Sequence, residues 1–150
     1  MIFAVVLAAA VALVLPAGWQ VVDVPNPPGS TVEVLRLGVG PTVDGFATKI
    51  NVIRQRYGDE AMLIDDWAAT STAYLKSQDG VHVVASHAEP LCDHNGWLVE
   101  STGKYNGRDL DLVQTALLDG GYEYVATYSR PVGSDVDRDA MKALDTLCPL

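Results

Sequence analysis

The densest group of side chains that could do chemistry lies in the stretch HAEPLCDH, which carries His87, Cys92, Asp93 and His94. Imidazole, thiolate and carboxylate groups are the ligands that zinc takes in proteins, and a closed site needs four in compatible geometry. If Cys92 belongs to a disulfide, only three candidates remain. A small metal-binding protein or metal-dependent enzyme using His87, Asp93 and His94 is therefore the alternative hypothesis. A solvated loop that holds one half of a disulfide is the favoured interpretation.

Signals of other catalytic chemistry are weak. Asp59-Glu60 and Asp65-Asp66 are paired carboxylates, and general acid–base catalysis would need one of them buried so that its pKa rises. A solvated loop and a helix N-cap explain these pairs more simply. The nucleophile pattern G-x-S-x-G and the phosphate-binding pattern G-x-x-x-x-G-K-[ST] are absent. We therefore expect a protein that is not an enzyme and that uses no cofactor.

Aromatic side chains offer a second kind of site, a binding surface. Tyr and Trp are favoured at interfaces because they bury area and keep a polar tip. The three tyrosines of the segment 122–129 share one strand parity, so packing beneath a helix explains them as well and is favoured. The candidate binding residues are Trp97, Tyr105, Tyr122, Tyr124 and Tyr128.

Composition limits the partners. The chain has 150 residues, 49% apolar and 19% charged, which is typical of one folded domain. Ten Lys and Arg against 19 Asp and Glu give a net charge of −9, which repels nucleic-acid phosphates and anionic lipid. We expect no nucleic-acid partner and no membrane contact beyond the N-terminal segment. The partner, a protein or a small ligand, stays unknown, and the protein is expected to be a monomer.

The N-terminal residues 2–15 form an uncharged apolar run. As a helix it would span about 21 Å, which is short of the roughly 30 Å core of a bilayer but typical of a secretory signal. Ala10-Val11-Ala12 fits the A-x-A cleavage pattern. We expect residues 1–17 to be a signal peptide or an apolar anchor and residues 18–150 to be one domain. The protein would then be periplasmic or extracellular, either free or tethered by residues 2–15.

The two cysteines, Cys92 and Cys148, agree with export. An even number of cysteines in an oxidising compartment predicts a disulfide. The bridge would close a loop of about 57 residues, worth on the order of 4 kcal/mol in the chain-entropy model. Two free buried thiols are the alternative.

The strand and helix signals predict an α+β domain. β-branched and alternating segments predict strands at 19–24, 31–37, 46–54 and 81–88, with a loop at 38–45. The dipeptides Asn106-Gly107 and Asp119-Gly120 predict tight type I′ turns. They join a three-stranded antiparallel meander over residues 96–129. Helical spacing predicts helices at about 65–78, capped by Asp65 or Asp66, and 134–147, capped by Ser134. An antiparallel sheet of six or seven strands, covered by two helices, follows.

Several of these residues carry a family resemblance. They are Gly45-Phe46, Ile50-Asn51-Val52, the helix from Asp66-Trp67 to Leu75, Gly96-Trp97, Tyr122-x-Tyr124 and the closing helix to Leu147. In this order they resemble the PsbP-like fold superfamily, which includes exported bacterial envelope proteins of the DcrB and LpqN type. The resemblance covers roughly residues 19–148 and rests on element order. It implies a PsbP-like α/β sandwich and a non-catalytic binding or accessory function.

Overall fold

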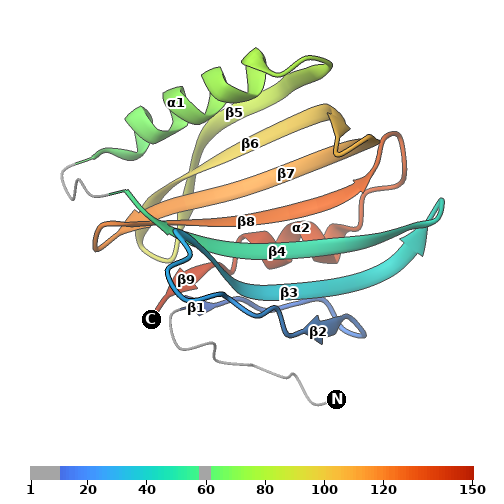
Figure 1. The fold of residues 1–150 in the computed structure, drawn as a ribbon, viewed down its shortest axis with the longest axis horizontal. Helices are drawn as coiled ribbons and strands as arrows, with labels where there is room; N and C mark the ends of the chain where they lie inside the picture. The colour runs from blue at the N-terminus through green and yellow to red at the C-terminus, as the bar shows by residue number, and fades with distance from the viewer. Residues whose placement is uncertain (1–10, 58–61) are drawn as a thin grey trace.

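The computed structural model of the protein describes residues 11–57 and 62–150. Its centre is a seven-stranded antiparallel sheet with the order β2-β3-β4-β8-β7-β6-β5. Helix α1 (Ile64–Ser77) packs on one face of the sheet and helix α2 (Arg138–Leu144) on the other (Figure 1). The strands are β2 (Gln20–Val22), β3 (Val32–Val43), β4 (Phe46–Arg56), β5 (Val81–Leu91), β6 (His94–Tyr105), β7 (Arg108–Asp119) and β8 (Tyr122–Pro131). The predicted α+β sandwich is confirmed.

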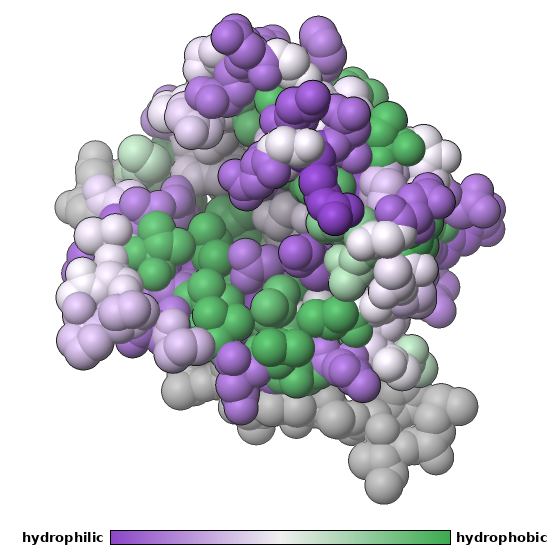
Figure 2. Space-filling model, turned by 45° about the vertical axis from the view of Figure 1, so that its right-hand side comes forward, coloured by the Kyte–Doolittle hydropathy of each residue, from purple (hydrophilic) through white to green (hydrophobic). Residues whose placement is uncertain are grey.

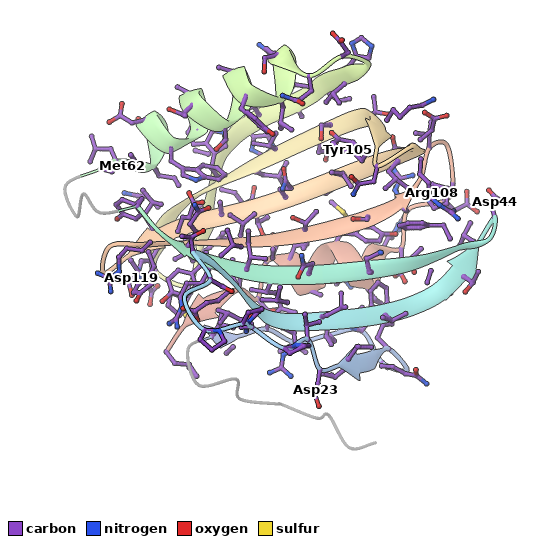
Figure 3. All side chains as sticks on the ribbon, in the orientation of Figure 1. Asp23, Asp44, Met62, Tyr105, Arg108 and Asp119 are labelled. Atoms are coloured by element: carbon purple, nitrogen blue, oxygen red, sulfur yellow. A yellow bond between two sulfur atoms is a disulfide. The ribbon has the colours of Figure 1, made fainter. Side chains whose placement is uncertain are left out.

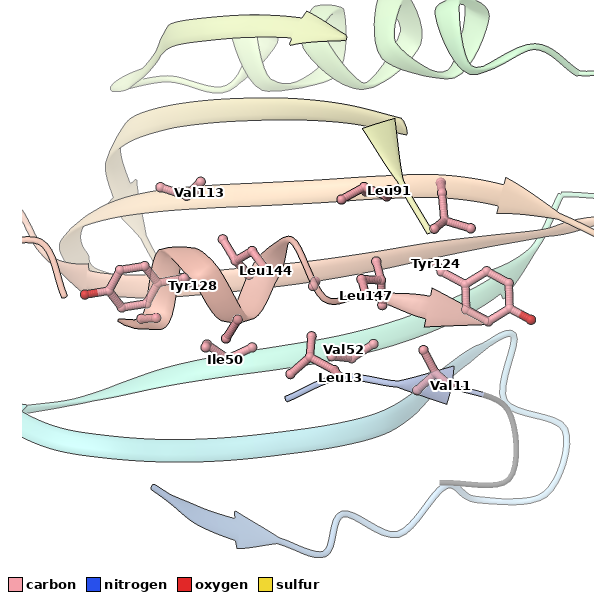
Figure 4. Close-up of a cluster of buried hydrophobic side chains, with 14 of the residues drawn as sticks. Val11, Leu13, Ile50, Val52, Leu91, Val113, Tyr124, Tyr128, Leu144 and Leu147 are labelled. Atoms are coloured by element: carbon pink, nitrogen blue, oxygen red, sulfur yellow. The ribbon is translucent and has the colours of Figure 1, made fainter. Parts of the chain in front are cut away.

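Strand alternation divides the apolar side chains between two cores. On β8, Tyr124, Ala126 and Tyr128 point toward α2, whereas Val125 points toward α1, because successive side chains on a strand face opposite ways. The larger core lies between the sheet and α2 and is closed at its lower side by the N-terminal residues (Figure 4). The smaller core lies under α1 and contains Trp67.

Two further strands of two residues each form a separate small sheet. Strand β1 (Val11–Ala12) pairs antiparallel with β9 (Cys148–Pro149). The predicted disulfide between Cys92 and Cys148 is confirmed, and it joins β9 to the turn between β5 and β6. The first ten residues of the expected signal or anchor lie outside the described residues, as does Asp59-Glu60. Residues 11–15, which the sequence assigned to the same apolar run, belong to the folded domain.

The expected loop at residues 38–45 is wrong, because β3 runs on to Val43 and turns at Asp44-Gly45. The glycines that suggested a loop are strand residues against which side chains pack closely. A Cβ at Gly38 would lie 2.6 Å from Leu15 Cδ2, and one at Gly40 would collide with the Trp19 ring. Small residues are needed here because another segment approaches the backbone.

One of the two predicted turns is shifted by a residue. Asn106 and Gly107 have φ values of 50° and 79°, as a type I′ turn requires. At the other end of β7, Asp119 pairs with Tyr122, so the central residues are Gly120 and Gly121, with φ values of 58° and 82°. A glycine pair adopts two positive φ values at lower cost than Asp119 would.

Both helix starts also differ from the predictions. Helix α1 begins at Ile64 with Leu63 at the N-cap position and no side-chain cap, so Asp65 and Asp66 lie inside the first turn. There their negative charges interact favourably with the positive end of the helix dipole and stabilise the helix. Helix α2 spans only Arg138–Leu144, and the hydroxyl of Ser134 donates to the Pro131 carbonyl instead of capping it.

The cap of α2 is Asp137, whose Oδ1 accepts hydrogen bonds from the backbone N–H groups of Asp139 at 2.9 Å and Ala140 at 3.2 Å. We expect Asp137→Ala to lower the free energy of unfolding by about 1 kcal/mol, as the loss of an N-cap does. Asp135→Ala, at an exposed position before the helix, is the control. Urea denaturation of both variants measures the difference, and equal midpoints would contradict the cap assignment.

Along the part of the chain that the structure describes, no helix combines the length and apolarity needed to cross a bilayer.

Candidate ligand-binding groove

A groove lies between α1 and the face of the sheet that α1 only partly covers. Its volume is about 460 Å³, within the range of small-molecule sites. Figure 2 shows apolar side chains gathered on a hollowed part of the molecular surface, bordered by polar ones. The lining comes from α1, β4, β6, β7, β8 and the residues next to them: Ile53, Tyr57, Met62, Trp67, Thr70, Ser71, Tyr74, Leu75, Val99, Gln114, Glu123 and Val125.

The helix presents one stripe to this groove and another to β5. Trp67, Ser71 and Leu75 recur every four residues, so they lie on one side of α1. The opposite side carries small residues over β5 and β6, where Thr72 Oγ1 lies 3.3 Å from Ser86 Oγ. Tyr74, on the groove side, is 65% exposed. The apolar stripe of α1 is therefore only partly buried, and the remainder lines the groove.

One ionisable group lies among the apolar lining residues of the groove. Glu123 Oε2 accepts a hydrogen bond from Trp67 Nε1 at 2.5 Å, which links the sheet to the helix. Burial raises the pKa of the Glu123 carboxyl, and the Trp67 hydrogen bond opposes this rise by favouring the charged form. The groove therefore offers one partly desolvated carboxyl that a ligand with a donor group could contact.

A polar row crosses the same face of the sheet next to the groove. Asn51, Thr127 and Gln114 are cross-strand neighbours on β4, β8 and β7, and Gln114 Nε2 donates to Thr127 Oγ1 at 3.1 Å. Within the described residues, the buried Oδ1 of Asn51 has no hydrogen-bond donor. A buried acceptor without a donor is unfavourable in free energy, so a ligand that donates a hydrogen bond to it would be stabilised.

The fold matches several solved structures. LpqN of Mycobacterium tuberculosis, described as involved in cell envelope biogenesis, aligns with a TM-score of 0.68 at 16% identity, over 93% of this chain and 83% of LpqN. The cyanobacterial PsbP of Synechocystis aligns at 0.55 and 14% identity, over 81% and 75% of the two chains. The chain has the PsbP-like fold.

A third match is the protein PA94 from Pseudomonas aeruginosa, described as a protein of unknown function and a putative regulator. It aligns with a TM-score of 0.56 at 16% identity, over 81% of this chain and 77% of PA94. No protein-family model matches the sequence, and no curated protein matches it. At these identities the likeness establishes the fold alone.

The PsbP-like domain does not bring the candidate metal ligands together. His94 Nδ1 lies 2.7 Å from the Cys92 carbonyl and its Nε2 lies 3.4 Å from Asp119 Oδ1. His87 lies further along β5, with its Nδ1 3.1 Å from the Ala88 carbonyl. Over residues 11–57 and 62–150 there is no group of three or more His, Cys, Asp or Glu side chains that could hold a metal. The cluster in HAEPLCDH is thus dense in sequence but dispersed along a strand and a turn.

The candidate aromatic residues are also separated. Tyr124 and Tyr128 are buried in the core beside α2, and two arginines, Arg54 and Arg56, stack on the ring of Tyr122 on that face. Tyr105 lies at the β6–β7 turn, far from Met62 (Figure 3), and its hydroxyl donates to Ser101 Oγ.

Only Trp97 lies under α1, on the side of the helix away from the groove, where its Nε1 donates to Ser86 Oγ at 2.8 Å. The five residues do not form one surface. The helix predicted at about 65–78 forms one wall of the groove, but no pattern in the sequence indicates the groove itself.

The raised pKa of Glu123 leads to a pH-dependent prediction. Because the folded protein holds this proton more tightly than the unfolded chain, whose pKa is near 4.5, stability falls as pH rises from about that value through the folded pKa. We expect Glu123→Gln, whose amide oxygen can still accept from Trp67, to unfold at a higher temperature than the wild type at neutral pH. The advantage should shrink as the pH falls below 4.5.

Thermal unfolding across this pH range tests the prediction, with Asp109→Asn at an exposed carboxylate as the control. Parallel curves for wild type and Glu123→Gln would show that Glu123 does not titrate differently in the folded protein.

Proposed function

We propose that this protein is an exported, non-catalytic binding protein that holds a small amphipathic ligand in the groove beneath α1. The observation that carries the proposal is the groove itself, an apolar hollow of about 460 Å³ with one carboxyl among its lining residues and a polar row beside it. Sites of this kind bind through apolar contact and orient the ligand with a few polar groups.

The lining supports a ligand with an apolar body and a hydrogen-bond-donating end. The apolar body would lie against Ile53, Val99 and Val125 on the groove floor. The donor would face the oxygens of Glu123 or Asn51. An anionic end is disfavoured by Glu123 and by the net charge of −9.

Export is supported by the disulfide, since such bonds persist in oxidising compartments. The likeness to LpqN, which is involved in cell envelope biogenesis, agrees with an extracytoplasmic accessory function. The contacts of the candidate metal ligands do not favour the metal hypothesis.

Binding is tested by titrating the protein with decanol, decylamine and decanoate below their micelle concentrations, with Trp67 fluorescence and calorimetry as readouts. We expect decanol and decylamine to bind and decanoate to bind more weakly. If none of the three compounds binds saturably, the proposed ligand class is wrong. If all three bind equally, Glu123 does not orient the ligand.

A matched pair of variants locates the site. Ser71→Trp fills the groove and is expected to weaken decylamine binding by about tenfold or more, which corresponds to roughly 1.4 kcal/mol. Ala73→Trp places the same side chain on the opposite side of α1, over Ser86 and Trp97, and is expected to leave binding unchanged. Equal losses in both variants would show that the ligand binds elsewhere.

A further inference from the structure

Two aromatic side chains of α1 line the groove with small residues between them. Trp67 and Tyr74 are seven positions apart, which places them on one side of the helix and about 10 Å apart along its axis. Thr70 and Ser71, the lining residues one turn after Trp67, have short side chains. The helix wall of the groove therefore has a notch, with Trp67 at one end and Tyr74 at the other.

No cation of the protein occupies this notch. In the part of the chain that the structure describes, the Lys and Arg side chains that lie on aromatic rings choose Phe46 and Tyr122, which are outside the groove. The described residues that line the groove include no Lys, Arg or His. A cation midway between two rings about 10 Å apart would lie about 5 Å from each, within the range of a cation–π contact.

Glu123 places a negative charge beside the notch that no protein cation balances. Its Oε2 accepts the hydrogen bond from Trp67 Nε1 at 2.5 Å. None of the ion pairs among the described residues includes Glu123. Burial raises the pKa of this carboxyl, because no nearby positive charge offsets the loss of water around it. A cationic ligand would supply that charge, and an N–H of the ligand could donate to Oε1.

The ring faces also favour methyl groups on the cation. A primary ammonium is compact, strongly hydrated and carries three N–H donors. Ring faces provide no ordinary acceptor for these donors, so a primary ammonium in the notch would lose hydration without full replacement. A tertiary ammonium keeps one N–H for Glu123 and places its methyl groups against the rings of Trp67 and Tyr74.

We propose that the polar end of the groove ligand is an N-methylated ammonium, held between the rings of Trp67 and Tyr74 with its N–H directed at Glu123. This inference rests on the proposed function, in which the apolar body of the ligand lies on the sheet. The net charge of −9 acts in the same direction, because it attracts a cation and repels an anion.

Three ligands with the same chain length separate the charge from the methyl groups. At neutral pH, N,N-dimethyldecylamine has both, decylamine has the charge alone, and decyldimethylamine N-oxide has the methyl groups without a net charge. In calorimetric titrations below the micelle concentrations, we expect N,N-dimethyldecylamine to bind about tenfold more tightly than either of the others. If it binds no more tightly than decylamine or the N-oxide, the inference is wrong and the proposed function stands. If none of the three binds saturably, both are wrong.

Two variants test the ring and the carboxyl. Tyr74→Leu, at a position that is 65% exposed, keeps an apolar side chain but removes the ring, and Glu123→Gln removes the negative charge. Each is expected to weaken the binding of N,N-dimethyldecylamine by about fivefold and to leave that of the N-oxide nearly unchanged. The matched controls are Tyr105→Leu, at the far end of the sheet (Figure 3), and Asp109→Asn, at an exposed carboxylate; neither should change binding. Wild-type affinity in Tyr74→Leu or Glu123→Gln would overturn the inference.

Discussion

Removing the disulfide, by Cys92→Ser together with Cys148→Ser, is expected to lower the free energy of unfolding by about 4 kcal/mol. The bond joins positions 56 residues apart, so its loss frees a long loop in the unfolded chain. In the folded protein the bond holds β9 against the β5–β6 turn, and β9 in turn pairs with β1. Without the bond, the unfolded chain gains entropy and the two termini lose their anchor in the folded protein. Both effects lower the free energy of unfolding.

Urea denaturation with and without a reducing agent measures this loss. The reductant should lower the midpoint of the wild type to that of the double variant and should leave the variant unchanged. An unreduced wild type with the same midpoint as the double variant would contradict a stabilising bridge.

Leu147→Ala is expected to lower the free energy of unfolding by about 2–5 kcal/mol, as other truncations of fully buried leucines do. Leu147 has no exposed surface and lies in the core between α2 and β9. The other members of this core come from elements far apart in sequence and include Val11, Val52 and Leu91. These residues cannot all close the cavity that the shorter side chain leaves, because the disulfide and two sheets hold them.

Leu150→Ala is the matched control three residues further on, at a position that is 66% exposed. Its effect on the free energy of unfolding should lie within about 0.5 kcal/mol. If Leu147→Ala were as mild as Leu150→Ala, the C-terminal segment would not pack as described.

Local sequence patterns predicted most of the sheet, because strand alternation and turn dipeptides depend only on neighbouring residues. The alternation of Tyr122–Pro131 and the dipeptide Asn106-Gly107 determine a strand and a turn by backbone geometry that needs no distant partner. The boundaries that differ depend on distant contacts. The glycines at 38 and 40 predict a loop from the sequence. Only their close contacts with Leu15 and Trp19 explain why this segment is a strand.

The candidate site was less predictable than the fold. The helical stripe with Trp67, Ser71 and Leu75 is visible in the sequence, but a stripe that faces a groove has the same spacing as one that faces a core. Glu123 was only one of the polar positions on an alternating strand. Its proximity to Trp67 spans 56 residues of chain, and no local pattern encodes that contact.

Sequence patterns were enough to predict the α+β class and the meander, because strand alternation and turn residues act through short-range geometry. They also predicted the Cys92–Cys148 disulfide, with two free thiols as the alternative, because each cysteine has a single possible partner. The burial of Val11 and Leu13 in the core, and the part of a sheet face that α1 leaves open, follow from tertiary contacts that no local pattern indicates. An apolar residue has the same free-energy gain from burial against lipid, helix or sheet. Which of these buries it depends on contacts between distant parts of the chain.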